Sequence, residues 1–219
     1  MEEEVELRAA PGFVEPSVRV ELPGLRLDWR SVEGGRRKSP REISRRLKDL
    51  SNRYRGASVV ALRAQPIPHA YRAFFHQIGL DPDVTRIPIE QAAVGRLMQG
   101  QFRSTNLVDD ALLIGLIETG VPIWALDADL VDAGGLGIRA SVAGDRLGST
   151  EFGHHLAPGR LVVADSQRVH ALLFGDVSPG HGVGPRTARI VLFAVGVAGV
   201  PAIHLEEALW ICAEVLGTG

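Results

Sequence analysis

The chain has 219 residues, of which 45% are hydrophobic and 23% are charged. This composition is typical of a globular protein and excludes fibrous, low-complexity and fully disordered chains. The length accommodates one large domain or two small ones, and we favour one. The single cysteine, Cys212, excludes an intramolecular disulfide bond and a cysteine-based zinc site.

Neither the N-terminus nor the most apolar stretch indicates targeting or membrane insertion. The chain begins Met-Glu-Glu-Glu, without the basic start and apolar stretch of a signal peptide. The most apolar stretch, residues 190–203, is shorter than the roughly 20 residues that a membrane-spanning helix needs. We therefore expect a cytoplasmic protein with no membrane partner.

Charge is unevenly distributed along the chain. From Arg30 to Arg55, ten basic and three acidic side chains give a net charge of +7, whereas the other residues carry −9. Such a basic run is a candidate contact for the phosphates of a nucleic acid, although a solvated helix face has the same composition. The candidate RNA-binding residues are Arg36, Arg37, Lys38, Arg41, Arg45 and Arg46.

The first predicted element is a β-hairpin. Residues 13–29 alternate apolar and polar side chains around a Pro23-Gly24 turn. Residues 31–39 are polar and contain glycine, and they predict a linker.

A helix is expected beyond the linker. Ser39 is a candidate N-cap, and Pro40 suits the first helical position. We therefore divide the chain into an N-terminal hairpin extension with a basic linker, residues 1–39, and a main domain, residues 40–219.

The middle of the chain predicts a short strand and then helices. The apolar run from Val59 to Leu62 predicts the strand. Apolar side chains at helical spacing predict three helices, over residues 68–79, 88–100 and about 105–118.

Beyond Gly120 the pattern changes to short apolar runs separated by Gly, Asp and Pro, which predict buried strands. These runs are VPIWALD, LGIRASV, RLVVAD, VHALLF and ARIVLFAV, and a last helix is expected over about 204–216. Because helices come first and strands later, the sequence predicts an α+β fold.

A glycine-rich stretch, residues 175–187, resembles a phosphate-binding loop at first sight. It lacks the Gly-Lys-Ser/Thr ending, so that motif fails. We expect instead a loop between two strands, whose glycines let a ligand approach the backbone closely.

Two groups of residues raise the possibility of a metal site. His154 and His155 are adjacent in a predicted loop, which is poor geometry for holding one ion. Asp127, Asp129 and Asp132 lack the spacing of a calcium loop. We therefore predict no metal and no cofactor, and we expect the lone cysteine to be inert core.

Polar residues that interrupt apolar runs are the remaining candidates. Charges at strand ends gather at one rim of a sheet, where sites are often built. The structural alternative is that an Asp at a strand end caps a turn and that the Arg pairs with one of the acids. The residues are Asn106, Asp109, Asp110, Asp127, Arg139, Asp165 and Asp176.

These residues occur in an ordered set of motifs: R-x3-G-Q-F-R-S-T-N-L-V-D-D (96–110), V-P-I-W-A-L-D (121–127), G-I-R (137–139), P-G-R-L-V-V-A-D (158–165), F-G-D (174–176) and T-A-R-I-V-L-F (187–193). Over roughly residues 40–200 the chain resembles the B3/B4 domain of the phenylalanyl-tRNA synthetase β subunit, in a free-standing form. The resemblance implies an α+β domain with an unusual β-sandwich and flanking helices.

The resemblance also implies a function. In the synthetase this domain hydrolyses tyrosine wrongly attached to phenylalanine tRNA, with water as the nucleophile. By resemblance, the chain would be a trans-acting aminoacyl-tRNA deacylase, which is a hydrolase. Its partner would be tRNA and not DNA, and it would need no cofactor. It assigns no catalytic side chain, because backbone groups and the terminal hydroxyl of the tRNA assist the water.

Nine positions are implied to bind the substrate: Asn106, Asp109, Trp124, Asp127, Arg139, Phe174, Gly175, Asp176 and Thr187. Gly175 would allow close backbone approach, and Arg139 would orient the acids. Two positions depart from the family. Trp124 stands where the family has His, and Asp176 stands where it has Gly, so a role for an acid or base at position 124 is lost.

Two other functions remain open. The chain could be a non-catalytic module that binds tRNA or another RNA. It could also be a protein that reuses the pocket for a small molecule or amino acid, which the −9 charge outside the basic segment favours. The sequence leaves open the amino acid, the tRNA, the oligomeric state and whether the chain is catalytic.

Overall fold

The computed structural model describes residues 9–148 and 153–218. Within them the helices are α2 (Pro16–Glu21), α3 (Arg41–Arg53), α4 (Gly56–Ala61), α5 (Pro66–Gln77), α6 (Pro88–Gln99), α7 (Leu107–Thr119) and α8 (Ala202–Gly217). The strands are β1 (Ala10–Pro11), β2 (Phe13–Val14), β3 (Arg26–Glu33), β4 (Ile123–Asp127), β5 (Gly137–Ala140), β6 (Arg146–Leu147), β7 (His154–His155), β8 (Leu161–Ala164), β9 (Val169–Leu172) and β10 (Arg189–Gly196). Short 3-10 turns span Leu62–Ala64, Ala128–Leu130 and Ala133–Gly135.

These strands form two sheets. The four-stranded sheet has the order β1-β3-β10-β4, and every neighbouring pair in it is antiparallel. The six-stranded sheet has the order β2-β5-β8-β9-β6-β7, with parallel pairing of β2 with β5 and of β6 with β9. Helices and two sheets in one chain confirm the predicted α+β class.

The long strand β10 is the centre of the four-stranded sheet. It pairs with β3 from Arg189, opposite Glu33, to Gly196, opposite Arg26, and with β4 on its other side. Because all but the first residue of β10 are buried, this strand reads as one continuous apolar run. β4 is left as the edge strand, which determines where the site lies.

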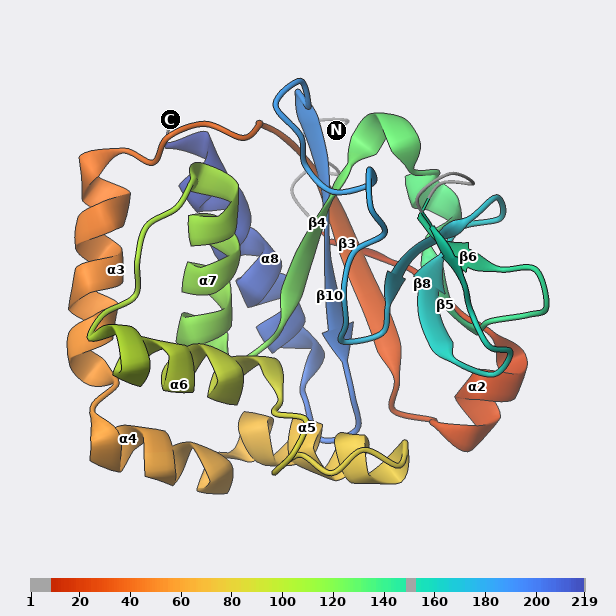
Figure 1. Ribbon diagram of the computed structural model, residues 1–219, viewed down its shortest axis with the longest axis horizontal. Coiled ribbons are helices and arrows are strands. Elements are labelled where there is room, and N and C mark those ends of the chain that lie inside the picture. The colour runs from red at the N-terminus through yellow and green to blue at the C-terminus, as the bar shows by residue number, and fades with distance from the viewer. Residues whose placement is uncertain (1–8, 149–152, 219) are drawn as a thin grey trace.

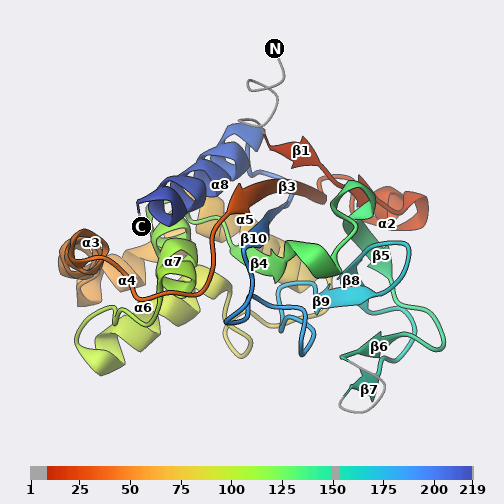
Figure 2. The same cartoon turned by 90° about the horizontal axis from the view of Figure 1, so that it is seen from above.

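The four-stranded sheet lies between a helical layer and the six-stranded sheet (Figures 1 and 2). On the helical side, α7, α8 and β4 approach closely at Gly115, where a Cβ atom would lie 2.7 Å from both Cys212 Sγ and Ile123 Cδ1. Cys212 is fully buried there, and burial raises the pKa of its thiol. On the opposite side, the Trp124 ring stacks on Phe193 and meets the ring of Phe174, which lies in the segment after β9.

The N-terminal hairpin prediction is wrong. Residues 16–21 form a helix that starts with Pro16 in its first turn. β3 pairs with β10 and with the short strand β1, which lies before the predicted hairpin. The alternating pattern suggested a strand, but Val20 is exposed. The buried side chains are Val18 and Leu22, which are four residues apart, the spacing of one face of a helix. The strand β3 thus belongs to the same sheet as the last strand of the chain. The proposed boundary after residue 39 stays a prediction, and residues 1–8 lie outside the described part.

Two further local predictions are wrong. The run from Val59 to Leu62 is helical: Leu62 is buried and Val59 packs against the core, whereas Val60 is exposed. Ser39 does not cap α3, whose N-cap is Pro40; the Ser39 hydroxyl instead donates to Asp110 Oδ2 at 2.5 Å. The other predicted helices and strands are present, within a few residues of the expected bounds.

Candidate functional site

A cavity of about 260 Å³ lies beside the edge strand β4. We call it the edge cavity. Its walls come from α7, from the loop between β9 and β10, and from the segment before α3. The lining residues are Arg36, Asn106, Val108, Asp109, Leu112, Trp124, Ala125, Val177, Gly182 and Val183. Three of the predicted substrate-binding residues and one predicted RNA-binding residue therefore meet in one place.

The N-terminus of α7 provides the polar wall of the edge cavity. Asn106 is the N-cap, and its Oδ1 accepts hydrogen bonds from the amides of Val108 and Asp109, both at 3.1 Å. Asn106 Nδ2 donates to Asp109 Oδ2 at 2.6 Å. Asp109 is exposed, so its carboxylate accepts this hydrogen bond from the N-cap residue and still faces solvent at the cavity.

The neighbouring Asp110 has a structural role. Its side chain is fully buried and accepts hydrogen bonds from the hydroxyls of Ser39 and Ser104 and from the amide of Thr105. These bonds join the segment before α3 to the segment before α7. Asp110 therefore holds together two walls of the edge cavity without lining it.

Trp124 forms the aromatic wall. Its ring stacks on Phe193 at a centroid distance of 5.4 Å and meets Phe174 edge-on at 5.9 Å. Phe174 also contacts the rings of Tyr71 and Phe75, and it adopts a left-handed backbone with φ of 57°. Phe174 thus supports Trp124 from behind but does not line the cavity.

Asp127 and Thr187 anchor the loop that closes the edge cavity. Thr187 Oγ1 donates to Asp127 Oδ2 at 2.5 Å and accepts from the Gly184 amide at 2.9 Å. The Asp127 amide donates to the carbonyl of His181 at 2.9 Å. Both residues act on the loop and are absent from the lining of the cavity.

Gly175 and Asp176 lie in the turn that follows β9, away from the cavity lining. The Gly175 amide donates to the Leu172 carbonyl at 3.0 Å, and a Cβ at Gly175 would lie 2.8 Å from Leu172 Cβ. Glycine is therefore needed here for the turn itself. Asp176 is exposed.

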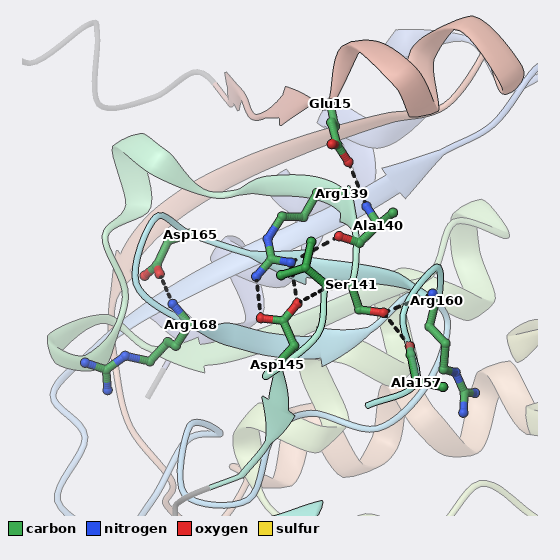
Figure 3. Close-up of polar contacts among 10 residues, drawn as sticks. Glu15, Arg139, Ala140, Ser141, Asp145, Ala157, Arg160, Asp165 and Arg168 are labelled. Carbon is green, nitrogen blue, oxygen red and sulfur yellow. Dashed lines mark hydrogen bonds and ion pairs between the residues drawn. The ribbon is translucent and has the colours of Figure 1, made fainter. Parts of the chain in front are cut away.

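Arg139 lies in the six-stranded sheet and does not orient the acids of the edge cavity. Its guanidinium forms a two-pronged ion pair with Asp145, with Nη1 to Oδ2 at 2.6 Å and Nη2 to Oδ1 at 3.0 Å (Figure 3). These hydrogen bonds hold the pKa of Asp145 below its usual value. Arg139 therefore follows the structural alternative, in which the arginine pairs with an acid. Its partner, Asp145, is not among the acids that the sequence pattern singled out.

The basic segment divides into engaged and unengaged side chains. Arg46 pairs with Glu118 at 2.7 Å and with Glu214 at 3.3 Å, and Arg37 Nη2 donates to the Leu216 carbonyl at 2.9 Å. These two side chains connect α3 and its preceding segment to α7 and α8. Arg36, Lys38, Arg41 and Arg45 are exposed and have no side-chain partner among the described residues.

A polar chain that the sequence analysis missed lies in the six-stranded sheet. Asp165 Oδ2 lies 2.8 Å from His170 Nε2, and His170 Nδ1 lies 3.1 Å from His181 Nδ1. Burial alone would raise the pKa of Asp165, but hydrogen bonds from His170 and three backbone amides lower it to about 2. The ionised carboxylate accepts the proton of His170 Nε2, which leaves Nδ1 to accept a proton from His181.

The sequence feature that points to these three linked side chains is His170, a polar residue within the apolar run VHALLF. It is completely buried. Burial lowers the pKa of His170, although Asp165 opposes that shift. No cluster of three or more metal-ligating side chains occurs in the described residues, and His154 and His155 form a two-residue strand.

The comparisons with known proteins give one partial relationship. No family model matches the chain. The phenylalanine–tRNA ligase β subunit of Gloeobacter violaceus is 34% identical over 132 residues, which cover 56% of this chain and 17% of that subunit. The chain therefore corresponds to less than a fifth of the length of this relative, and the two share a distantly related region. No described helix is long and apolar enough to span a membrane.

Proposed function

We propose that the protein binds the aminoacylated end of a tRNA in the edge cavity and hydrolyses the ester of a wrongly attached amino acid. The observation that carries the proposal is the composition of this one cavity. It joins an exposed carboxylate, an apolar wall and an arginine from the basic segment. The similarity to part of a phenylalanine–tRNA ligase β subunit supports the choice of tRNA.

The cavity suits the amino-acid moiety of the substrate. Every aminoacyl ester carries an α-ammonium group, which the exposed Asp109 carboxylate would bind by a charge-assisted hydrogen bond. Val108, Leu112 and Trp124 would contact an apolar side chain. The cavity volume of about 260 Å³ limits the bound portion to roughly one amino acid.

The outer edge of β4, which the β9–β10 loop covers only in part, offers a backbone N–H group to the ester. The Asp127 amide points across this edge to His181, and side-to-side alternation in a strand places the Ala125 N–H and C=O on the same edge. Leu126 forms an isolated antiparallel bridge with Gly182 on this edge, and the Ala125 N–H has no acceptor across it among the described residues. An N–H in this position can stabilise the oxyanion that forms when water attacks the ester.

The lining residues of the edge cavity include no serine, cysteine or histidine. Side-chain nucleophilic catalysis therefore has no candidate group in the described lining. The chemistry that fits is attack by water on a positioned ester, where orientation supplies much of the rate enhancement. The bulky ring of Trp124 reduces the space beside the apolar wall of the cavity. We therefore propose a preference for an amino acid other than tyrosine.

The basic segment would hold the phosphates next to the acceptor end. Arg36 lines the cavity itself, and Lys38, Arg41 and Arg45 continue from it along the start of α3. Since each neutralised phosphate releases counterions, binding through these side chains weakens as salt increases.

The test is deacylation of a panel of mischarged tRNAs at two salt concentrations, together with tRNA binding. Selective, salt-sensitive release of one amino acid supports the proposal. Binding without release would indicate an RNA-binding module, and neither activity would favour an amino-acid-like ligand. Asp109→Asn should lower release about tenfold or more without unfolding the protein, because the amide keeps the shape of the side chain.

Matched controls separate the site from general effects of charge. Asp49→Asn changes an exposed acid on α3, and Arg63→Gln changes a basic side chain between α4 and α5. Neither control should alter release. If Asp49→Asn reduces release as strongly as Asp109→Asn does, the edge cavity is not the site.

A further inference from the structure

A larger cavity than the edge cavity lies in the half of the molecule that contains the six-stranded sheet. It has a volume of about 600 Å³ and lies between α2, the end of α5 and strands β5, β8 and β9. We call it the α2–α5 cavity. It shares no lining residue with the edge cavity. Its size is within the range of about 300–1,000 Å³ that is typical of small-molecule sites.

The floor of the α2–α5 cavity is apolar. Leu22 directly after α2, Ile78 directly after α5, and Leu161, Leu172 and Leu173, in and just after strands β8 and β9, contribute to it. Leu22 is buried, and the other four are half-buried, so they offer apolar surface that the fold does not cover. Covering such surface with an apolar ligand group is favourable by about 25 cal/mol per Å².

Two opposite charges stand at this floor. Glu21, at the end of α2, and Arg160, just before β8, both line the cavity. Both are exposed, and neither side chain forms an ion pair or hydrogen bond within the described residues. The charged groups of the cavity lining are therefore one free carboxylate, from Glu21, and one free guanidinium, from Arg160.

The wall that holds Arg160 is fixed by a hydrogen-bond network (Figure 3). Ser141 Oγ donates to the Ala157 carbonyl at 2.7 Å and accepts from the Arg160 amide at 3.0 Å. On the α2 side, Glu15 Oε2 accepts from the Ala140 amide at 2.9 Å. The backbone of these walls is thus held in place before any ligand binds.

We propose that the α2–α5 cavity binds a zwitterionic amino acid with an apolar side chain. Arg160 would hold the carboxylate, because its planar guanidinium suits two parallel hydrogen bonds. Glu21 would hold the ammonium group, and the side chain would cover the leucine-rich floor. This inference does not depend on the proposed function, since it concerns a different cavity.

The test is calorimetric titration of the full chain with leucine and phenylalanine, and with their N-acetyl and amide derivatives. Leucine is expected to bind, and each derivative, which lacks one of the two charges, should bind about tenfold more weakly. Glu21→Gln should weaken leucine binding by a similar factor and leave N-acetyl-leucine unchanged. Arg160→Gln should weaken leucine binding and leave leucinamide unchanged.

Controls use exposed residues of the same types on other elements. Glu42→Gln on α3 and Arg168→Gln, between β8 and β9, should leave leucine binding unchanged. The proposal is overturned if neither amino acid binds at about 10 mM. It is also overturned if leucine binding is insensitive to Glu21 and Arg160 but is lost in Asp109→Asn, because that result would place the ligand in the edge cavity.

Discussion

The N-terminus of α7 and the six-stranded sheet use charged side chains in different ways. At α7, Asp110 is buried and accepts hydrogen bonds from three donors, while its neighbour Asp109 remains exposed at a cavity. In the six-stranded sheet, Arg139 and Asp165 are each bound to a partner inside the sheet region. A charge in an apolar run is therefore a site candidate only where its neighbours leave it exposed beside a cavity.

The largest effect is expected from removing the buried carboxylate of α7. Asp110→Ala leaves the two serine hydroxyls and the Thr105 amide without their acceptor, and should reduce the free energy of unfolding by about 3 kcal/mol. Urea unfolding measures this change. Asp109→Ala, which removes only an exposed part of the cap, should cost about 1 kcal/mol. Equal losses would contradict the contrast between these neighbours.

A smaller loss is expected in the six-stranded sheet. Arg139→Gln breaks the ion pair with Asp145 and should reduce the free energy of unfolding by about 2 kcal/mol. Adding Asp145→Asn should restore part of that loss, because the unpaired carboxylate is removed. Ligand binding at the edge cavity should not change. A change in release of amino acid from tRNA would show that the two regions are coupled.

The Asp165–His170–His181 chain predicts a pH dependence of stability. The folded pKa values of both histidines lie below those of the unfolded chain, so the unfolded state binds more protons below about pH 6.5. The free energy of unfolding should therefore fall as the pH decreases below that value. Asp165, with a folded pKa of about 2, adds a second loss as the pH falls from about 4 towards 2.

Urea unfolding across this pH range measures the effect, and His181→Gln is the variant of choice because His181 is only half-buried. It should flatten the dependence near pH 6. His204→Gln, at a partly exposed position of α8, is the control and should leave the pH dependence unchanged. An identical pH dependence in His181→Gln and the unaltered protein would refute the assignment.

The smallest effect separates the engaged and unengaged parts of the basic segment. Arg46→Gln should cost about 0.5–1 kcal/mol of stability, because its ion pairs are partly exposed, and should leave tRNA binding unchanged. Arg36→Gln should leave stability unchanged and lower the salt dependence of tRNA binding by about one phosphate contact. The opposite outcome would mean that the basic segment does not contact RNA through the cavity mouth.

Strong periodic patterns were predictable from the sequence alone. The helices α3, α5, α6, α7 and α8 and the apolar strands up to β10 were expected, because each repeats apolar residues with one clear period. The prediction failed at residues 13–29 and 59–62. In both segments the tertiary packing, and not the local pattern, decides which of the apolar residues are buried.

The candidate site could be predicted in part. Asn106, Asp109 and Trp124 were named and lie together at the edge cavity. Arg139 and Asp176 do not line it, and the backbone of Ala125 was not considered because an edge strand cannot be recognised from its own sequence. The buried His170 was overlooked because its partner His181 lies 11 residues away across a loop.

The sequence by itself determined the α+β class, the main helices and strands, and the polar residues available for a site. These follow from local composition and from periodicity, which act over a few residues. Only the tertiary structure decided which polar residues pair with each other and which remain exposed beside a cavity. Those outcomes depend on contacts between segments as far apart as Ser39 and Asp110, whose spatial proximity no local pattern encodes.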